Sequence, residues 1–275
     1  MSKLSKAQAK QHREALALVA ESKARRLTVD ERWQIIETYH EGANHMNGAA
    51  GAFFTPHGLA QDFSLEVPRG KGRRIVDLCA GIGALSFHCE DRVFSRDDVG
   101  HFVCVERNPD YVEAGRAVMP DATWVCASVF DLSAYQHLGP FDCAISNPPF
   151  GAIPAEGFEG AYTGQRFEYR VMEVASKVAR YGAFILPQQS ANFRYSGMPC
   201  FEYVESDLTR KFREQTGIVM EPGCGIDTAH YAKAWKGVSP ICEIVCCDFE
   251  PKAAEPVVAP AEIPMGQQDL FARVA

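Results

Sequence analysis

Apolar side chains recur at two different spacings in this sequence. Near the N-terminus, residues 4–26 and the stretch from 29 to about 40 place them at helical intervals between charged residues. Thr28 stands three positions before Glu31, a capping-box signature that marks the start of the second helix. We therefore expect a helical N-terminal extension over residues 1–50.

From residue 73 onward, short apolar runs alternate with helical segments. Strands are expected at 73–78, 101–106, 122–126, 141–146, 181–187, 217–221 and 239–249. Helices are expected near 84–92, 109–118, 164–180 and 201–214, and a further helix near 57–63 precedes this region. This alternation predicts a mostly parallel α/β sheet of seven strands with helices on both faces. The last two strands lack a strong helix between them, so we expect an antiparallel edge hairpin joined by 222–238.

The composition changes after Phe249. Residues 250–266 are mostly Ala, Pro, Val and Glu without periodicity, which is typical of an extended linker. Large apolar side chains return at 267–271. We therefore divide the chain into the extension, an α/β domain over 51–250, and a linker with a terminal peptide over 251–275.

Overall composition narrows the class of protein. Hydrophobic residues make up 47% of the chain, but no run approaches ~18 apolar residues, so no membrane span is expected. Most of the 10 cysteines lie in apolar, strand-like runs, and the sequence has neither a CxxC pair nor a His/Cys zinc pattern. This usage is typical of core residues in a reducing cytoplasm, and no metal site is expected.

The net charge of −7 argues against a protein that coats nucleic acid indiscriminately. Locally, however, residues 1–26 carry seven Lys/Arg and two Glu, which gives +5. A second basic cluster consists of Arg69, Lys71, Arg73 and Arg74. Each cluster is compatible both with an ordinary solvated face and with contact to a phosphate backbone.

The most distinctive motif is Asn147-Pro148-Pro149-Phe150, which follows the apolar run 141–146. The prolines fix the backbone and remove two N–H donors, so this corner is stiff and rich in acceptors. The side-chain carbonyl of Asn147 and the carbonyl of Pro148 offer two acceptors, and Phe150 offers a flat face. This set suits a planar group that carries an NH2, such as the exocyclic amine of adenine. Considered alone, it also has the appearance of a Pro-rich turn.

A strand that runs into a glycine turn lies upstream, at residues 74–83. The small residues Ala80, Gly81 and Gly83 let a ligand approach the backbone closely, at the strand end where open α/β sheets bind ligands. The turn has G-x-G rather than G-x-G-x-x-G, and G-K-[ST] is absent, which argues against a phosphate-gripping P-loop.

Two acidic residues and a serine follow the strand ends. Glu106 ends the next strand about 25 residues after the glycine turn, where an acid accepts hydrogen bonds from ribose hydroxyls. This spacing suits NAD and an adenosyl ligand equally, and Asp77 favours the latter because its carboxylate anchors an ammonium group. Ser128 and Val129, at the end of the third strand, suit an adenine ring. Asp77 and Ser128 are also compatible with simple caps of the turns that follow them.

In this order, the motifs resemble those of the S-adenosylmethionine-dependent N6-adenine methyltransferases. The Phe-Phe-Thr-Pro segment at 53–56 comes first, followed by the glycine turn, Glu106 and the Asn-Pro-Pro-Phe elbow. The order resembles the bacterial DNA adenine subgroup and the stand-alone enzymes of plasmids and phages, over roughly residues 50–250. The resemblance implies a Rossmann-like class I methyltransferase fold, S-adenosyl-L-methionine as cofactor, and DNA as substrate.

The resemblance also implies roles for the matched positions. For the cofactor they are Phe54, Thr55, Pro56, Asp77, Ala80, Gly81, Gly83, Glu106, Ser128, Val129 and Asn147. For the target base they are Asn147, Pro148, Pro149 and Phe150. Ser128 departs from the family, which often has Asp there. The stretch 188–216 is short for a recognition domain, although it carries basic residues that suit a phosphate backbone, so low sequence selectivity is expected.

The terminal residues Gln267-Gln268-Asp269-Leu270-Phe271 resemble the peptide by which bacterial proteins bind the sliding clamp. Leu270 and Phe271 are adjacent anchors for an apolar pocket, and Gln267 supplies a polar hook. The linker lets the peptide reach the clamp while the enzyme stays on DNA. Asp269 occupies the Ser/Asp position of that peptide. The competing interpretation is a C-terminal patch that packs back on the domain.

Other functions stay open at this point. The same chemistry on structured RNA is a close alternative, because related enzymes with this elbow act there. Methylation of a glutamine amide in a protein is a third, although that family usually has Tyr at the position of Phe150 and lacks the Phe-Thr-Pro segment. A non-enzymatic module that binds nucleic acid or the clamp is a fourth. The intact set of motif residues argues against it: Asp77, Gly81, Gly83, Glu106 and Asn147.

Overall fold

The structure is a computed structural model of the 275-residue chain. It describes residues 4–40, 53–70, 72–93 and 100–249. The predicted linker and the clamp-like peptide, with Gln267, Asp269, Leu270 and Phe271, lie outside the described residues.

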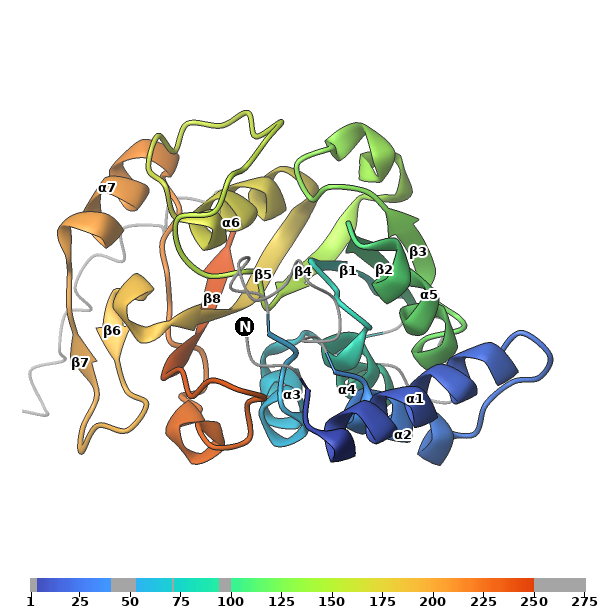
Figure 1. The fold of residues 1–275 in the computed structure, drawn as a ribbon. Coiled ribbons are helices and arrows are strands. Elements are labelled where there is room, and N and C mark those ends of the chain that lie inside the picture. Colours follow the sequence, from blue (N-terminus) through green and yellow to red (C-terminus); the bar gives the residue numbers. More distant parts are fainter. Residues whose placement is uncertain (1–3, 41–52, 71, 94–99, 250–275) are drawn as a thin grey trace, which may run out of the picture.

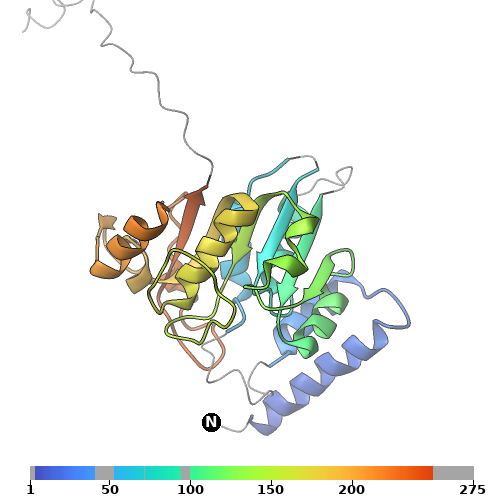
Figure 2. The same ribbon diagram turned by 90° about the horizontal axis from the view of Figure 1, so that it is seen from above.

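Within the described residues, a mixed sheet has the strand order β3–β2–β1–β4–β5–β8 (Figure 1). Its strands are β1 (Arg74–Leu78), β2 (His101–Glu106), β3 (Thr123–Cys126), β4 (Phe141–Ser146), β5 (Ala179–Pro187) and β8 (Cys242–Asp248). Neighbouring strands are parallel except β8, which runs antiparallel to β5 at the edge (Figure 2). The order of strands reverses between β1 and β4, and such switch points open a crevice at the carboxyl ends of the strands.

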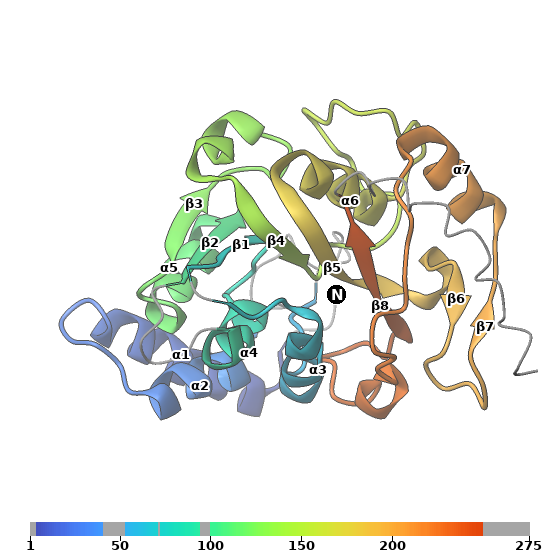
Figure 3. The same ribbon diagram turned by 180° about the vertical axis from the view of Figure 1, so that it is seen from behind.

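Helices cover both faces of the sheet. They are α1 (Lys6–Glu21), α2 (Val29–Thr38), α3 (His57–Phe63), α4 (Ala84–Val93), α5 (Pro109–Val118), α6 (Phe167–Val178) and α7 (Asp207–Thr216). One buried cluster joins the sheet to α1 through α5, and a second joins the opposite face to α6 and α7. Figures 1 and 3 show α6 and α7 on one side and α1–α4 on the other. Burial on both faces explains why the central strands are almost continuously apolar.

Local capping signals set the starts of two helices. Thr28 Oγ1 accepts from the Glu31 N–H at 3.3 Å, and Glu31 Oε2 accepts from the Thr28 N–H at 2.8 Å, so the predicted capping box opens α2. At α5 the side chain of Asn108 accepts from the Asp110 N–H at 3.0 Å, and Pro109 occupies the first helical position. A proline there loses no helical hydrogen bond.

The sheet contains six strands in the described chain, where the sequence predicts seven. The stretch 217–221 alternates as a strand does, with Ile218 and Met220 buried, but it forms only one bridge, between Glu221 and Cys246. Gly217 ends α7 in the left-handed conformation (φ 73°), and Pro222 follows. These two breakers leave too few residues for a ladder, so the predicted edge hairpin reduces to the antiparallel strand β8.

The predicted helix at 201–214 begins later than expected. Its first residues instead form β7 (Glu202–Tyr203), which pairs antiparallel with β6 (Phe193–Arg194). Ser206 then caps α7 by accepting from the Thr209 N–H at 3.2 Å. The short β6–β7 hairpin lies beyond β8 in Figure 3 and is absent from the sequence prediction.

The N-terminal helices pack on the same core as the sheet. Ala15 and Val19 of α1, and Ile35 and Ile36 of α2, belong to the buried cluster that includes α4 and α5. Figure 2 shows α1 along the edge at which the parallel strands end. Among the described residues, no helix is both long and apolar enough to cross a membrane.

Candidate functional site

The glycine turn (79–83) and the Asn-Pro-Pro-Phe elbow (147–150) begin side by side. β1 and β4 are parallel neighbours, with Asp77 opposite Ile145, and each motif starts two residues after that pair. The Ser146 hydroxyl donates to the carbonyl of Leu78, which ties the two strand ends together. The two motifs therefore share one end of the crevice at the switch point.

The amide of Asn147 has a fixed orientation. Its Nδ2 donates to the carbonyl of Phe53 at 2.9 Å and to Thr55 Oγ1 at 3.0 Å. A carbonyl only accepts hydrogen bonds, so the opposite orientation would place two acceptors against each other. Asn147 Oδ1 is buried and finds no hydrogen-bond partner among the described residues. The elbow thus presents an unused acceptor, held in place by the 53–56 segment.

Phe54 lies over the glycine turn. Gly81 has φ +57°, and a Cβ built on it would lie 3.1 Å from the Phe54 ring. The ring of Phe54 is also in edge contact with Tyr111 of α5 and with Tyr39, which follows α2, at centroid distances of 5.1 and 6.1 Å. Only glycine fits the backbone conformation and the approach of the ring together. Thr55 and Pro56 are buried beside it and lead into α3.

Asp77 is a buried carboxylate at the end of β1. Its Oδ2 accepts from the Ser86 hydroxyl of α4 at 2.6 Å, while Oδ1 has no hydrogen-bond partner within the described part of the chain. Burial raises the pKa of Asp77 to about 7, and the charge of Glu106 adds to the rise against the opposing Ser86 hydrogen bond. A half-satisfied buried carboxyl is unusual and indicates a missing polar partner.

Glu106 ends β2 and supports the glycine turn. Its Oε2 accepts from the Gly81 N–H at 2.9 Å, and its Oε1 accepts from the Asn108 N–H at 2.8 Å. Burial raises the pKa of Glu106, although these backbone hydrogen bonds oppose the rise. A carboxylate has about four acceptor positions, so Glu106 keeps acceptor capacity for a hydroxyl of a ribose.

The other small residues of the turn serve its packing. Ala80 is buried, and its N–H donates to the carbonyl of Val105 at 3.0 Å. Gly83 has φ +81°, and a Cβ there would lie 3.1 Å from the ring of Trp124, so its open side faces β3. Cys79 has φ +65°, and it is the only non-glycine residue with a positive φ among the described residues. Backbone strain of this kind often marks a functional turn.

Ser128 and Val129 lie where the chain leaves β3. Ser128 Oγ accepts from the Phe130 N–H at 3.2 Å, so the serine caps its own turn. Val129 is buried, and its carbonyl accepts from the Tyr135 hydroxyl at 2.6 Å. Ser128 Oγ keeps a second lone pair for a ligand.

A buried acid holds the far side of the elbow. Pro148 is buried, Pro149 and Phe150 are half-buried, and Gly151 follows with φ +95°. The N–H of Gly151 donates to Glu168 Oε2 at 2.9 Å, and the Ser190 hydroxyl donates to Glu168 Oε1 at 2.8 Å. Glu168 therefore links the elbow to the turn that ends β5.

Three supporting residues escape sequence analysis: Tyr39, Ser86 and Glu168. Each contacts the site through an aromatic contact or a side-chain hydrogen bond, from a residue outside the motifs themselves. A serine or glutamate in a helix is usually solvent-exposed, so its type gives no signal. Burial inside an otherwise apolar helix face is the one clue, and it requires the fold.

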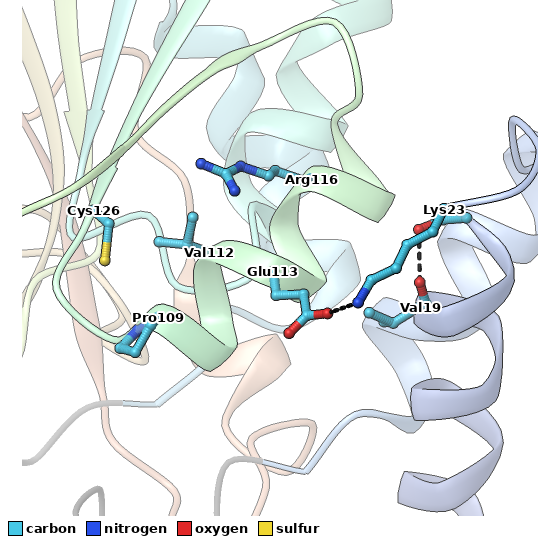
Figure 4. Close-up of a pocket in the computed structure, with 8 residues that line it drawn as sticks. Val19, Lys23, Pro109, Val112, Glu113, Arg116 and Cys126 are labelled. Atoms are coloured by element: carbon cyan, nitrogen blue, oxygen red, sulfur yellow. Dashed lines mark hydrogen bonds and ion pairs between the residues drawn. The ribbon is translucent and has the colours of Figure 1, made fainter.

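A hollow of about 530 Å³ lies away from these motifs. It is lined by α1, α5 and the end of β3, through Val19, Ser22, Lys23, Pro109, Val112, Glu113, Arg116 and Cys126. Figure 4 shows the ion pair between Lys23 and Glu113 at its margin. Residues 53–56, the glycine turn and the elbow do not line it. The described residues also contain no group of three or more His, Cys, Asp or Glu that would hold a metal ion.

Comparison of the sequence with protein-family models and with curated proteins finds no match. The structure does resemble solved structures. One is the methyltransferase subunit of a type I restriction-modification system from Streptococcus thermophilus, with a TM-score of 0.57 and 16% identity over 82% of this chain. A modification subunit of a type I restriction enzyme from Vibrio vulnificus YJ016 gives 0.52 and 14% over 81%. The chain spans about half of these two subunits, 49% and 50%.

A third neighbour is similar to this chain over most of its length. It is a class I S-adenosylmethionine-dependent methyltransferase from Listeria monocytogenes, with a TM-score of 0.61 and 12% identity over 93% of this chain and 84% of that one. The chain has the class I methyltransferase fold. The predicted fold class is thereby confirmed, with six strands in the sheet in place of seven.

Proposed function

We propose that this chain transfers a methyl group from S-adenosyl-L-methionine to the N6 amine of adenine in DNA. The observation that carries the proposal is Asn147 Oδ1, a buried acceptor without a partner in the described chain, held next to the glycine turn. The two restriction-system neighbours named above support DNA as the substrate class.

The residues present fit the cofactor. Asp77 Oδ1 is an unpaired buried acceptor, among the described residues, that suits the ammonium group of the methionine part. Glu106 keeps acceptor capacity for the ribose, and Gly81, which has no Cβ, lets a ligand approach its backbone once the Phe54 ring moves aside. Ser128 and Val129 would border the adenine. When bound, the cofactor supplies an electrophilic methyl group on its sulfonium.

The elbow would act on the target amine. The N6 lone pair of adenine is delocalised into the ring and is a weak nucleophile. Hydrogen bonds from N6–H to Asn147 Oδ1 and to the Pro148 carbonyl favour a more tetrahedral nitrogen, and they strengthen as positive charge develops there. No strong base is needed before attack, because the proton leaves afterwards.

Alignment is the other contribution of the elbow. Glu168 fixes Gly151, the Phe53 carbonyl fixes the Asn147 amide, and the prolines remove backbone freedom. A base in a duplex must leave its stack to reach this corner, and the half-buried ring of Phe150 offers it a stacking surface.

A partner is part of the proposal. The terminal peptide 267–271 would bind the bacterial sliding clamp and place the enzyme on newly copied DNA. The support is the sequence itself, in which Leu270 and Phe271 follow Gln267 and Asp269 in the clamp-binding order. The basic residues of the chain are too few for indiscriminate coating of DNA at a net charge of −7, so a second tether is useful.

Expression in a methylation-deficient host tests the substrate. DNA and RNA from that host are digested to nucleosides, and N6-methyladenosine or its deoxy form is measured in each pool by mass spectrometry. We expect the methyl mark in the DNA pool. A mark in RNA alone would assign the chemistry to RNA, and a mark in neither pool would contradict the proposed reaction.

Asn147→Ala tests the mechanism. We expect kcat to fall by about 10²–10³-fold, because the variant loses an acceptor that acts on developing charge. The cofactor Kd, measured by calorimetry, should stay within about fivefold, since only two hydrogen bonds to the 53–56 segment are lost. Turnover at the wild-type rate would show that the amine is held elsewhere.

A further inference from the structure

The β6–β7 hairpin starts beside the elbow. β5 ends at Pro187, a single 3₁₀ turn (Gln188–Ser190) follows, and β6 begins at Phe193. The Ser190 hydroxyl shares Glu168 with the N–H of Gly151, which directly follows the elbow. The root of the hairpin and the elbow are thus tied to one buried carboxylate.

A second buried carboxylate holds the hairpin itself. Glu243 of β8 is buried, and its oxygens accept from Gln188 Nε2 at 2.7 Å, from the Tyr195 N–H at 2.9 Å, and from the Ser196 N–H and hydroxyl at 3.0 and 2.9 Å. The Val204 N–H also donates to the carbonyl of Asn192 at 2.8 Å, across the hairpin. These anchors give the two-residue strands a fixed position relative to the sheet.

The outer side of the hairpin is a ladder of aromatic rings. Phe193 is buried at its base and stacks on Phe201, with centroids 5.7 Å apart and planes at 25°. Phe201 meets Tyr203 edge-on at 4.7 Å. Phe201 is 38% exposed and Tyr203 is 70% exposed. Large rings held in water on a rigid support indicate a surface that binds a flat, apolar partner.

Charge distinguishes between possible partners. The segment 188–216 contains four basic residues (Arg194, Arg210, Lys211, Arg213) and four acidic ones (Glu202, Glu205, Asp207, Glu214), so it is neutral in a chain of net charge −7. Two of its cations are paired, Arg210 with Asp207 and Arg213 with Glu205. A neutral aromatic surface is poorly suited to tracking phosphates and well suited to stacking on bases, which are uncharged.

We propose that Phe201 and Tyr203 form a stacking platform for an unpaired nucleotide of the DNA strand that carries the target adenine. The inference rests on the proposed function, because it requires a nucleotide strand at the elbow. Glu168 fixes the root of the hairpin against the elbow and Glu243 fixes the hairpin on β8, so a base stacked on Tyr203 would limit the path by which the strand enters the site. Stacking accepts any base, which agrees with the low sequence selectivity expected from the short 188–216 stretch.

The first experiment compares full-length variants on a single-stranded oligodeoxynucleotide of about 16 nucleotides with one adenine. We expect Tyr203→Ala to raise KM and the DNA Kd by about tenfold, while kcat and the cofactor Kd stay unchanged. Tyr203→Phe keeps the ring and should match the wild type. Leu65→Ala, a change at a 46% exposed residue of the 3₁₀ turn that follows α3, is the control for loss of exposed apolar surface.

Two further readouts separate stacking from charge. The ratio of the DNA Kd of Tyr203→Ala to that of the wild type should stay constant between about 50 and 200 mM salt, because a ring releases no counterions. An abasic site is moved along the oligonucleotide one position at a time, and at one position it should weaken wild-type binding as much as Tyr203→Ala does. In the Tyr203→Ala variant the abasic site should weaken binding little further, because the two changes remove the same stacking contact.

The outcomes are distinguishable. If the wild type methylates the oligonucleotide and Tyr203→Ala has the same KM and Kd, the platform is refuted while the proposed function stands. If Tyr203→Phe loses affinity as Tyr203→Ala does, the hydroxyl rather than the ring makes the contact, and stacking is refuted. If the wild type methylates no DNA, the proposed function fails and the platform fails with it.

Discussion

The most informative side chains of this site are those whose buried polar atoms lack a hydrogen-bond partner. Asn147 Oδ1 and Asp77 Oδ1 are buried acceptors, and neither has a partner in the part of the chain that the structure describes. An unpaired buried acceptor costs roughly 1–3 kcal/mol of folding free energy, so two of them lower the stability of the ligand-free chain substantially. Such a cost is offset when a ligand supplies the donors.

The raised pKa of Asp77 has consequences for stability and for binding. Because burial raises this pKa from 3.8 to about 7, protonation favours the folded state, and the free energy of unfolding of the ligand-free chain should fall as pH rises from about 4 to 7. An ammonium group favours the ionised carboxylate instead. Cofactor affinity should therefore rise with pH up to about 7, by at most about tenfold per pH unit, and binding should release a proton below that pH.

Calorimetry in buffers of different ionisation enthalpy measures that proton release, and a melting series against pH measures the stability. Asp77→Asn has the same shape and no titratable group, so it should remove the Asp77 contribution to both pH dependences and weaken cofactor binding. An unchanged pH profile in this variant would exclude Asp77 as the ammonium partner.

Glu168 is expected to position the elbow without touching the substrate. In Glu168→Ala the N–H of Gly151 loses its acceptor, so we expect kcat to fall by about 10²-fold from misplacement of Asn147. Glu168→Gln should recover most of this loss, because its carbonyl serves Gly151 and its NH2 donates to the Ser190 hydroxyl.

Glu173→Ala is the matched control. Glu173 lies on the same helix and accepts from the N–H groups of Ala161 and Tyr162, farther along the loop that follows the elbow. Both alanine variants should lose about 1–3 kcal/mol of folding free energy, measured by urea unfolding. Equal loss of kcat in the two would mean that loop stability, rather than elbow geometry, limits the reaction.

The elements of the fold show where sequence reasoning succeeds. β2, β4 and α5 occupy the predicted residues because buried parallel strands read as continuous apolar runs and Asn108-Pro109 marks a helix start. The stretch 217–221 has the alternation of a strand, but the glycine cap before it and the proline after it limit it to one bridge. The motifs of the site are local and recognisable. Their connections are not, because Asn147 and Phe53 are 94 residues apart.

The helical extension is expected to support the cofactor site through Tyr39. This buried ring contacts both Phe54 and Tyr111, so Tyr39→Ala removes the backing of the ring that covers Gly81. We expect a loss of about 3–5 kcal/mol in folding free energy and a weaker cofactor Kd, measured by calorimetry below the melting temperature.

Ile35→Ala provides the comparison, because Ile35 is fully buried on α2 of the same extension and its loss leaves the aromatic contacts of Tyr39 intact. It should destabilise the fold by about 2–5 kcal/mol and leave the cofactor Kd unchanged. If both variants bind the cofactor equally, the extension acts on stability alone.

The whole chain combines a sheet of the class I methyltransferase fold, a layer of N-terminal helices at the carboxyl ends of its parallel strands, and a C-terminal tail. The tail contains the clamp-like peptide 267–271. The sheet and the layer share one buried cluster, whereas residues 250–266 have the composition of a linker. Catalysis and partner binding should therefore be separable by mutation.

The tail predicts a defined interaction. A peptide of residues 262–275 should bind the bacterial sliding clamp in a fluorescence polarisation assay, and the Leu270→Ala, Phe271→Ala double variant should not, because both apolar anchors are lost. Val274→Ala lies outside the motif and should bind as the wild type does. Indistinguishable binding by the double variant would remove the clamp from the list of partners.

For the proposed reaction, the hydrogen bonds that hold the Asn147 amide to residues 53–55 predict an order of ligand binding. A ligand that approaches Gly81 meets the Phe54 ring, so we expect binding of the donor to displace the segment that also carries the Phe53 carbonyl and Thr55. The elbow acquires its oriented acceptor only when that segment has returned. Steady-state kinetics should accordingly be compulsory-order, with the donor first and the nucleic acid second.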